Sequence, residues 1–258
     1  MNLIDTHAHL THPDLSGNIS KILELAKEAG VEKIITCGTN LQDSQLCCEL
    51  AVQHEMVYAA VGVHPTEIEN PETDFRFELT ELAKNPKVVA IGEIGLDYYW
   101  EKNEAKREVQ KKILRAQLGA AVQLDLPVII HNREADEDIF DELEHYKDSD
   151  RLRGVMHCFL GDESDFLRLK KLNFMVSFTG VITYSNFQPA TLEFLKSINH
   201  SSCMIETDSP FLSPEPRVKP NTPAQVAKVA SKLAEIWGVT VDEVAEITST
   251  NAKKLFKI

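Results

Sequence analysis

The sequence lacks any long apolar segment. None of its apolar runs approaches the roughly 18 residues that a membrane-spanning helix needs. The first residues, Met1 to Asp5, also lack the basic stretch and following apolar stretch that mark an export signal. These absences predict a cytoplasmic protein with no membrane partner.

Cysteine is scarce as well. The chain has five cysteines, an odd number, and no two of them form a Cys-x-x-Cys pair. This usage argues against a disulfide framework and against a Cys-rich structural zinc site. We expect reduced thiols that are buried or half-buried.

Basic residues are in deficit. Lysine and arginine number 27 against 40 aspartates and glutamates, which gives a formal net charge of -13. This balance weighs against a protein that coats duplex DNA through a basic surface. It does not exclude phosphate chemistry at a local site, because bound cations are often the largest charges there.

The residues that are present are typical of one folded α/β domain. The chain has 258 residues, of which 43% are hydrophobic and 26% charged, so intrinsic disorder is not expected. No repeat, low-complexity tract or linker divides the sequence, which predicts a single domain over residues 1–258. The length by itself fits either two small domains or one large α/β barrel.

Short apolar or β-branched runs alternate with amphipathic stretches, the pattern of βαβ units and a parallel sheet. The predicted strands are Leu3–Asp5, Lys33–Cys37, Val57–Val63, Val88–Ile91, Pro127–Ile130, Gly154–His157, Phe174–Ser177 and Cys203–Glu206. The predicted helices are Asn18–Ala29, Gln42–His54, Phe75–Lys84, Ala105–Gln123, Glu134–His145, Ser164–Lys171, Pro189–Ser197, Pro223–Trp237 and Thr240–Phe256. Eight such units predict a TIM (β/α)8 barrel with its active site at the carboxyl ends of the strands.

Local chemistry marks several helix ends. Thr222 before Pro223 predicts a hydroxyl N-cap. Gly30 and Gly238 are placed to end helices in the left-handed conformation. Thr240 and Glu243 fit a capping box.

Polar groups follow the predicted strands. They are His7 and His9 after the first run, Glu93 and Asp97 after the fourth, His131 after the fifth, His157 in the sixth and Asp208 after the eighth. Alternation along an extended segment puts His7 and His9 on one face. A single polar group at a strand end is more often a half-buried partner or a cap than a ligand. The joint occurrence favours one binuclear metal centre.

The ligand types indicate the metal class. Imidazole and carboxylate without thiolate suit Mg, Mn, Zn, Ni, Co or Fe in the divalent state. Two such ions roughly 3.5–4 Å apart can deprotonate a shared water and bind both the attacking and the leaving oxygen. The sequence therefore predicts hydrolysis of a phosphodiester, ester or amide.

Six motifs together resemble the TatD family of metal-dependent hydrolases and deoxyribonucleases. They are Asp5-Thr6-His7-Ala8-His9, Gly62-Val63-His64-Pro65, Gly92-Glu93-Ile94-Gly95-Leu96-Asp97, His131-Asn132-Arg133, His157-Cys158-Phe159 and Glu206-Thr207-Asp208-Ser209-Pro210. The resemblance implies a TIM barrel that hydrolyses phosphodiester bonds in DNA, often as an exonuclease. It also implies that His7, His9 and Asp208 hold one divalent cation, that His131 and His157 hold the other, and that Glu93 bridges them.

Roles beyond metal binding have alternatives. Asp208 is a candidate general base, which makes Asp208 and Glu93 the expected catalytic residues. His64, Arg133 and Arg217 are candidates for binding phosphate, although His64 can instead cap a turn and Arg217 can be a solvated loop charge. The aromatic run at Tyr98, Tyr99 and Trp100 either stacks on a base or packs at the barrel mouth.

One segment departs from the family pattern. Where the family often ends its last loop in Asn-Glu-Pro, this chain has Asn221-Thr222-Pro223. Thr222 is expected to preserve the helix start, so the departure puts substrate preference in doubt and not the metal chemistry.

Single-stranded DNA or DNA ends are the expected substrate, and no obligate protein partner is implied. The first alternative is an amidohydrolase, a deaminase or an aminoacyl-ester deacylase on the same barrel. Many amidohydrolases bridge their metals with a modified lysine, whereas here that position holds Glu93. The second alternative is a binding barrel without catalysis, which predicts no tightly bound metal.

Overall fold

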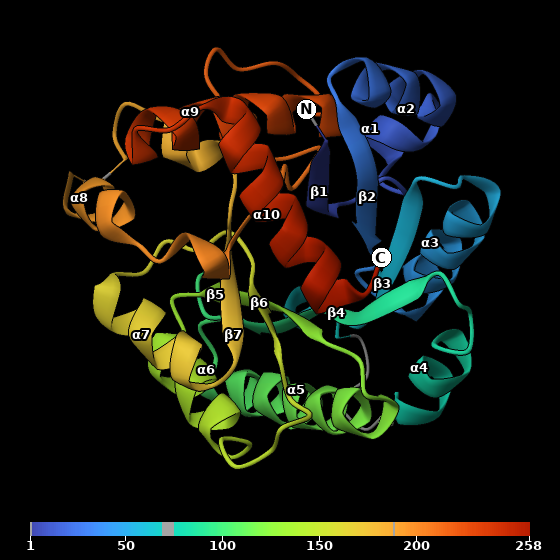
Figure 1. The fold of residues 1–258 in the computed structure, drawn as a ribbon. Helices are drawn as coiled ribbons and strands as arrows, with labels where there is room; N and C mark the ends of the chain where they lie inside the picture. Colours follow the sequence, from blue (N-terminus) through green and yellow to red (C-terminus); the bar gives the residue numbers. More distant parts are fainter. Residues whose placement is uncertain (1, 69–74, 188) are drawn as a thin grey trace. The chain divides into compact units, whose positions relative to one another are not determined.

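A computed structural model of the chain describes residues 2–68, 75–187 and 189–258 (Figure 1). All eight predicted strands are present in the predicted order. They are β1 Leu3–Ala8, β2 Val31–Cys37, β3 Val57–Val61, β4 Val88–Asp97, β5 Val128–Arg133, β6 Gly154–Met156, β7 Phe174–Phe178 and β8 Cys203–Ile205.

Helices separate the strands as predicted. They are α1 Pro13–Ser16, α2 Ile19–Glu28, α3 Leu41–Gln53, α4 Arg76–Leu82, α5 Glu104–Leu124, α6 Asp136–Glu144, α7 Glu163–Lys171, α8 Pro189–Ser197, α9 Val226–Trp237 and α10 Val241–Phe256. Short 3-10 helices are η1 Pro65–Glu67, η2 Gly180–Thr183, η3 His200–Ser202 and η4 Pro223–Gln225. Within the described ranges, no helix combines the length and the apolar character that crossing a membrane requires.

The chain divides into two compact units. The first unit contains the described residues of 1–36 together with 158–167 and 175–258. The second contains the described residues of 37–157 together with 168–174. The organisation of residues 1–258 as a single domain stays a prediction.

In the first unit, β1 pairs in parallel with β2, and β7 pairs in parallel with β8. A further parallel bridge joins Ala8, at the end of β1, to Ser209, beyond the end of β8. This bridge sets the carboxyl ends of β1 and β8 side by side. The segments that carry His7, His9 and Asp208 are therefore neighbours.

Helix α10, red in Figure 1, packs against both of these strands. The Asn251 side-chain amide donates hydrogen bonds to the carbonyls of His200, at 2.9 Å, and of Cys203, at 2.8 Å. The Ser249 hydroxyl donates to the carbonyl of Asn2 at 2.6 Å. These bonds satisfy backbone groups at the amino ends of β1 and β8, so α10 anchors the two strands that lead to the site.

In the second unit, β3, β4, β5 and β6 pair in parallel in this order. All ten residues of β4 are buried, as expected for an interior strand of a parallel sheet covered on both faces. A side chain at Gly95, where φ is +155°, would overlap the backbone carbonyl of His131. Glycine at this position therefore permits the close approach of β4 to β5 that sets Glu93 beside His131.

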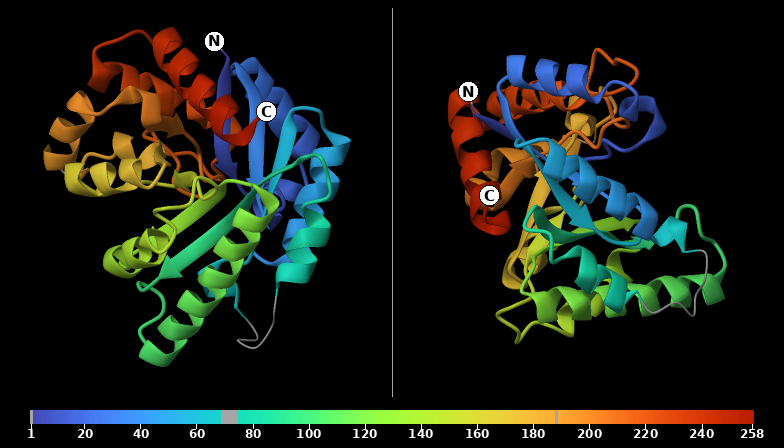
Figure 2. Two further views of the ribbon diagram at one scale, coloured as in Figure 1. Left: turned by 60° about the horizontal axis from the view of Figure 1, so that its bottom comes forward. Right: turned by 90° about the vertical axis from the view of Figure 1, so that its right-hand side faces the viewer.

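Helix α5 packs beside β4, as both views of Figure 2 show in green. Two of its buried glutamines complete the hydrogen bonding of strand ends. Gln117 accepts from the amide of Val63 at 2.8 Å and donates to the carbonyl of the same residue at 3.0 Å. Gln110 accepts from the amide of Asp97 at 3.0 Å and donates to the carbonyl of Pro65 at 3.3 Å. A buried glutamine amide is costly without hydrogen-bond partners, so these two side chains hold the segments after β3 and β4 in place.

Strand boundaries differ from prediction mainly at the site. Strand β4 continues from the predicted end at Ile91 to Asp97, and β1 continues from Asp5 to Ala8. Glu93 and His7 therefore lie within strands and not in the loops that follow them. A register shift between Ile91 and Ile94 lets β4 resume pairing with β5 beyond Gly92.

Three of the predicted helix ends are confirmed and one is wrong. Gly30 and Gly238 have φ of 87° and 68°, and Thr240 forms the capping box with Glu243. The Thr222 hydroxyl makes no capping hydrogen bond. The chain instead enters α9 through η4, which begins at Pro223, and the side chain of Asn221 accepts from the Thr222 amide at 2.9 Å.

The cysteine prediction is confirmed for all five residues. Each is a free thiol, four of them are buried, and Cys158 is half-buried.

Candidate metal centre

In the second unit, one carboxylate faces three imidazoles. Oε1 of Glu93 lies 2.8 Å from Nδ1 of His131, 3.2 Å from Nε2 of His157 and 3.6 Å from Nε2 of His64. Glu93 is 3% exposed, so this carboxylate lies almost entirely out of water. Four separate segments supply these groups: β4, β5, the residue after β6, and the N-cap of η1. Ligand atoms of His64, Glu93 and His131 lie within 4.8 Å of one another, close enough to hold one cation.

Asp97 orients one of these imidazoles. Its Oδ2 lies 3.1 Å from Nε2 of His131, whose other ring nitrogen faces Glu93. Burial disfavours the charged ring, but the hydrogen bonds to Asp97 and Glu93 prevail and raise the pKa of His131. Burial likewise disfavours the charged carboxylate of Asp97, but the hydrogen bonds from His131 and from the Trp100 amide prevail and lower the pKa of Asp97. The sequence included Asp97 in a motif without giving it a role. Residues 93 and 97 share one face only because β4 extends to Asp97, beyond the predicted end at Ile91.

In the first unit, two imidazoles and one carboxylate converge. Nε2 of His7 lies 3.2 Å from Nε2 of His9. Oδ1 of Asp208 lies 3.3 Å from Nε2 of His9 and 3.7 Å from Nε2 of His7. The predicted placement of the two histidines on one face therefore holds within this unit.

The backbone holds this second group in place. The Asp208 amide donates to the carbonyl of His7 at 2.8 Å, and the His9 amide donates to the carbonyl of Ser209 at 2.7 Å. Asp208 has φ of 54°, in the left-handed region that a residue with a side chain rarely adopts. Such a conformation persists where the surrounding bonds fix it and is often found at functional sites.

Two further buried carboxylates accompany this group, and sequence reasoning assigned neither of them. Asp5 accepts hydrogen bonds from the amide and hydroxyl of Thr207, at 2.9 and 2.6 Å. Glu206 accepts from the amide of Cys158 at 2.6 Å and is fully buried. Asp5 therefore braces the segment that carries Asp208, while Glu206 supplies one more carboxylate of ligand type.

We expect Asp5 to lower the stability of the metal-free protein progressively as the pH rises from about 4 to about 8. Burial raises the pKa of Asp5 from its ordinary value of 3.8 to about 8. A carboxyl whose folded pKa is raised stabilises the fold fully below its unfolded pKa, and this stabilisation is lost as the pH rises through the folded pKa. Asp5→Asn imitates the neutral acid and cannot titrate. In this variant the free energy of unfolding should fall less steeply with pH, by up to roughly 1.4 kcal/mol per pH unit, which corresponds to one proton. Urea unfolding in chelator at several pH values measures this, and equal slopes in the two proteins would reject the assignment.

The candidate phosphate-binding residues lie in different surroundings. His64 caps η1, because its Nδ1 accepts from the Thr66 amide at 3.2 Å, and the same ring also faces Glu93. The Arg133 guanidinium lies 3.8 Å from the ring centroid of Tyr99. Arg217 pairs with Glu215 at 3.3 Å, and its side chain is 53% exposed. The capping role of His64 and the solvated position of Arg217 are therefore both observed.

The aromatic run separates into two kinds of residue. Tyr98 is buried and its hydroxyl donates to Asp138, so it packs in the interior. Tyr99 and Trp100 are 41% and 68% exposed and meet edge to face, with centroids 4.9 Å apart. The packing alternative holds for Tyr98, whereas the next two side chains are open to solvent.

The chemistry of these groups fits divalent cations. Imidazole nitrogens and carboxylate oxygens converge in each unit, and no described group of this kind contains a thiolate. Buried carboxylates in close contact with several imidazoles are costly unless protons or metal ions balance their charge. The second unit offers His64, Glu93, His131 and His157, and the first offers His7, His9 and Asp208.

Comparisons with known proteins agree along the whole chain. The family described as "TatD related DNase" matches residues 4–257. The chain is 39% identical over 258 residues to the "Uncharacterized metal-dependent hydrolase YabD" of Bacillus subtilis, with 99% of each chain covered. It is 31% identical over 262 residues to the "3'-5' ssDNA/RNA exonuclease TatD" of Escherichia coli, again with 99% of each covered.

Among solved structures, the chain is similar to YjjV, a TatD homologue from Escherichia coli. The TM-score is 0.91 at 32% identity, with 99% of this chain and 98% of YjjV covered. Together with the eight parallel strands and alternating helices, this likeness confirms the (β/α)8 barrel fold.

Proposed function

Because the chain belongs to the TatD family of metal-dependent hydrolases, we propose that it is a deoxyribonuclease that cleaves phosphodiester bonds at the ends of single-stranded DNA. One observation of this structure carries the proposal: a single buried oxygen of Glu93, on β4, faces three imidazoles, which come from β5 and from the segments after β3 and β6. The exonuclease named among the relatives supports the choice of substrate.

We propose two divalent cations per chain. His7, His9 and Asp208 would hold one, His131 and His157 the other, and Glu93 would bridge them. The short distances within each unit support the two ligand groups. The bridging role rests on the family resemblance. Mg, Mn, Zn, Ni, Co and Fe all suit this ligand set, and such ions supply an acidified water and stabilise the charge that develops on phosphate oxygens.

The remaining roles belong to the chain's own side chains. Asp208 would accept the proton of the attacking water on its carboxylate and return it to the leaving oxygen. Two observations support this role. Asp208 lies 3.3 Å from His9, within the proposed ligand group, and it is only 9% exposed. Asp97 acts through His131, whose ring it orients, and is therefore a positioning residue.

Metal should raise the melting temperature of the chelator-treated protein. A ligand that binds only the folded state at 100 times its Kd adds roughly 2.7 kcal/mol, which corresponds to about 5–10 °C for a chain of this size. Differential scanning calorimetry with and without Mn or Zn measures the shift. The binding-barrel alternative predicts no shift.

Arg133 is proposed to bind a phosphate of the substrate. Arg133→Ala should raise KM for an oligonucleotide about 10-fold or more, with metal affinity unchanged, because a charged hydrogen bond is lost. Arg133→Lys should recover the affinity only in part, since lysine lacks the bidentate geometry. Arg153→Ala is the matched control in the same unit, because Arg153 pairs with Asp125 at 2.8 Å. An unchanged KM in Arg133→Ala would count against the role.

A substrate panel tests the proposed activity. Single-stranded DNA, double-stranded DNA, RNA, phosphomonoesters, cyclic amides and aminoacyl esters would be offered with Mg, Mn and Zn. We expect release of mononucleotides from single-stranded DNA. Hydrolysis of an amide or an aminoacyl ester without any nuclease activity would overturn the proposal in favour of the amidohydrolase or deacylase alternative. The cytoplasmic location and the lack of an obligate protein partner stay predictions.

A further inference from the structure

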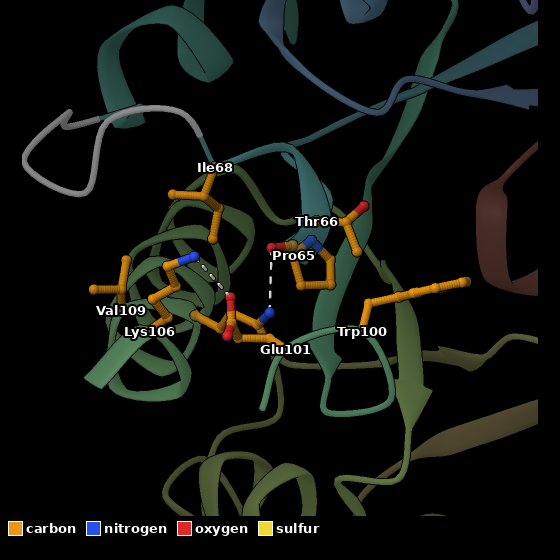
Figure 3. A pocket seen from close by; sticks show the side chains of 8 residues that line it. Pro65, Thr66, Ile68, Trp100, Glu101, Lys106 and Val109 are labelled. Carbon is orange, nitrogen blue, oxygen red and sulfur yellow. Dashed lines mark hydrogen bonds and ion pairs between the residues drawn. The ribbon is translucent and has the colours of Figure 1, made fainter. Parts of the chain in front are cut away.

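A cavity of 460 Å³ lies in the second unit, beside the candidate metal ligands (Figure 3). Its walls include Pro65 and Thr66 of η1, Trp100 and Glu101 after β4, and Lys106 and Val109 of α5. In Figure 3 the Trp100 ring projects on one side of the view, and Val109 and Lys106 lie on the other. The volume is within the range of small-molecule sites, about 300–1,000 Å³. Polar and apolar groups both line the cavity, and with one broad aromatic ring they suit a flat, partly apolar ligand that also forms hydrogen bonds.

Two walls of this cavity are tied directly to the candidate metal ligands. Asp97 holds Nε2 of His131 through its Oδ2, and its Oδ1 accepts from the amide of Trp100 at 2.9 Å. On the other wall, His64 is the N-cap of η1 and faces Glu93. The cavity therefore keeps a fixed position next to the group that is proposed to bind metal.

Two cationic side chains lie near the exposed aromatic rings, and a third lines the cavity. The Arg133 guanidinium lies 3.8 Å from the Tyr99 centroid and 5.7 Å from that of Trp100. Nζ of Lys102 lies 5.6 Å from the Tyr99 centroid. Lys106 pairs with Glu101 at 3.3 Å, but its side chain is 70% exposed, so a phosphate can compete for it. In a protein of net charge -13, this combination of cations and open rings complements a nucleic acid strand.

We propose that this cavity receives one unpaired base of the single-stranded substrate, which stacks on the ring of Trp100 beside the scissile phosphodiester. The inference rests on the proposed nuclease function and adds the side chain that makes the enzyme prefer single-stranded over double-stranded DNA. A base inside a duplex is already stacked on both faces, so only an unpaired or flipped-out base can enter. The site thereby favours single strands and tolerates all four bases, because every base has a π face.

A kinetic test uses ten-residue oligonucleotides that each carry one abasic position. In the wild type, removal of the base at one particular position should lower kcat/KM by roughly 5- to 150-fold, the range measured for loss of one stacked base. In Trp100→Ala this position should no longer matter, and Trp100→Phe should restore much of the effect. Phe77→Ala, which removes another exposed aromatic ring of the same unit that does not line the cavity, should behave as the wild type. An abasic profile that is the same in Trp100→Ala and in the wild type overturns the inference.

Fluorescence separates this inference from the proposed activity. The chain has two tryptophans, and Trp237 is 9% exposed and stacked on His200 with centroids 3.9 Å apart. Trp237→Phe leaves Trp100 as the single reporter, and a phosphorothioate decanucleotide with Mn should quench its emission, whereas a fully abasic strand should not. Quenching without hydrolysis of ordinary DNA would support the base site and reject the nuclease. Hydrolysis without quenching would reject the base site alone, and the absence of both would reject both proposals.

Discussion

Glu93→Ala is expected to lower the rate of single-stranded DNA hydrolysis by at least about 10³-fold, more than the roughly 10- to 100-fold loss typical of residues that only support a metal ligand. Its Oε1 faces three imidazoles at 2.8 to 3.6 Å, so its removal leaves these rings without their shared carboxylate. Bound metal, measured by elemental analysis, should fall below two ions per chain. The melting temperature of the metal-free variant should stay close to that of the metal-free wild type, because active-site residues are seldom optimised for stability.

Glu142→Gln provides the matched control. Like Glu93, Glu142 is 3% exposed. It pairs with a basic side chain, since its Oε2 accepts a hydrogen bond from Nε of Arg115 at 2.7 Å. It belongs to α6 and has no place in the proposed chemistry. This variant should lose stability and keep its activity per folded molecule. Full activity in Glu93→Ala, or equal activity losses in the two variants, would refute the assignment.

Asp208→Ala is expected to lower kcat by about 10²- to 10⁴-fold, the usual contribution of a general base. The loss should appear in kcat more than in KM, since the proton transfer occurs only as the transition state forms. Asp208→Asn keeps the shape but cannot accept the proton, so it should be nearly as inactive. Rates measured at saturating oligonucleotide and metal give the comparison.

Asp14→Ala is the control for this variant. Asp14 lies on α1 in the same unit, and its side chain is 65% exposed. We expect wild-type kinetics. A kcat of Asp208→Asn within a factor of two of the wild type would show that another group removes the proton.

The fold was predictable because apolar residues recur at different spacings in strands and in helices. Most residues of the strands are buried, so a strand appears in the sequence as a short, largely apolar run. The largest error was the end of β4, which was predicted at Ile91 but lies at Asp97. Gly95 belongs to the strand, since the approach of β4 to His131 leaves no room for a side chain. Such a contact depends on the neighbouring strand and leaves no local signal.

The candidate ligands were predictable for a similar reason. Histidine and carboxylate at the ends of several strands converge whenever the strands are parallel, whatever their exact register. The bond of Asp97 to His131 does depend on register, which pairs Gly95 with His131 and Asp97 with Arg133. The bracing of Thr207 by Asp5 depends on the approach of the segment after β8 to β1. These supporting roles require the three-dimensional arrangement.

We propose that two divalent cations, held by this chain's own imidazoles and carboxylates, hydrolyse phosphodiester bonds. The most direct measurement is a titration of the metal-free protein with Mn, in which the initial rate of mononucleotide release from labelled single-stranded DNA is followed. We expect no hydrolysis without metal and a rate that rises to a plateau at two equivalents per chain. A plateau at one equivalent, or no hydrolysis at any ratio, would contradict it.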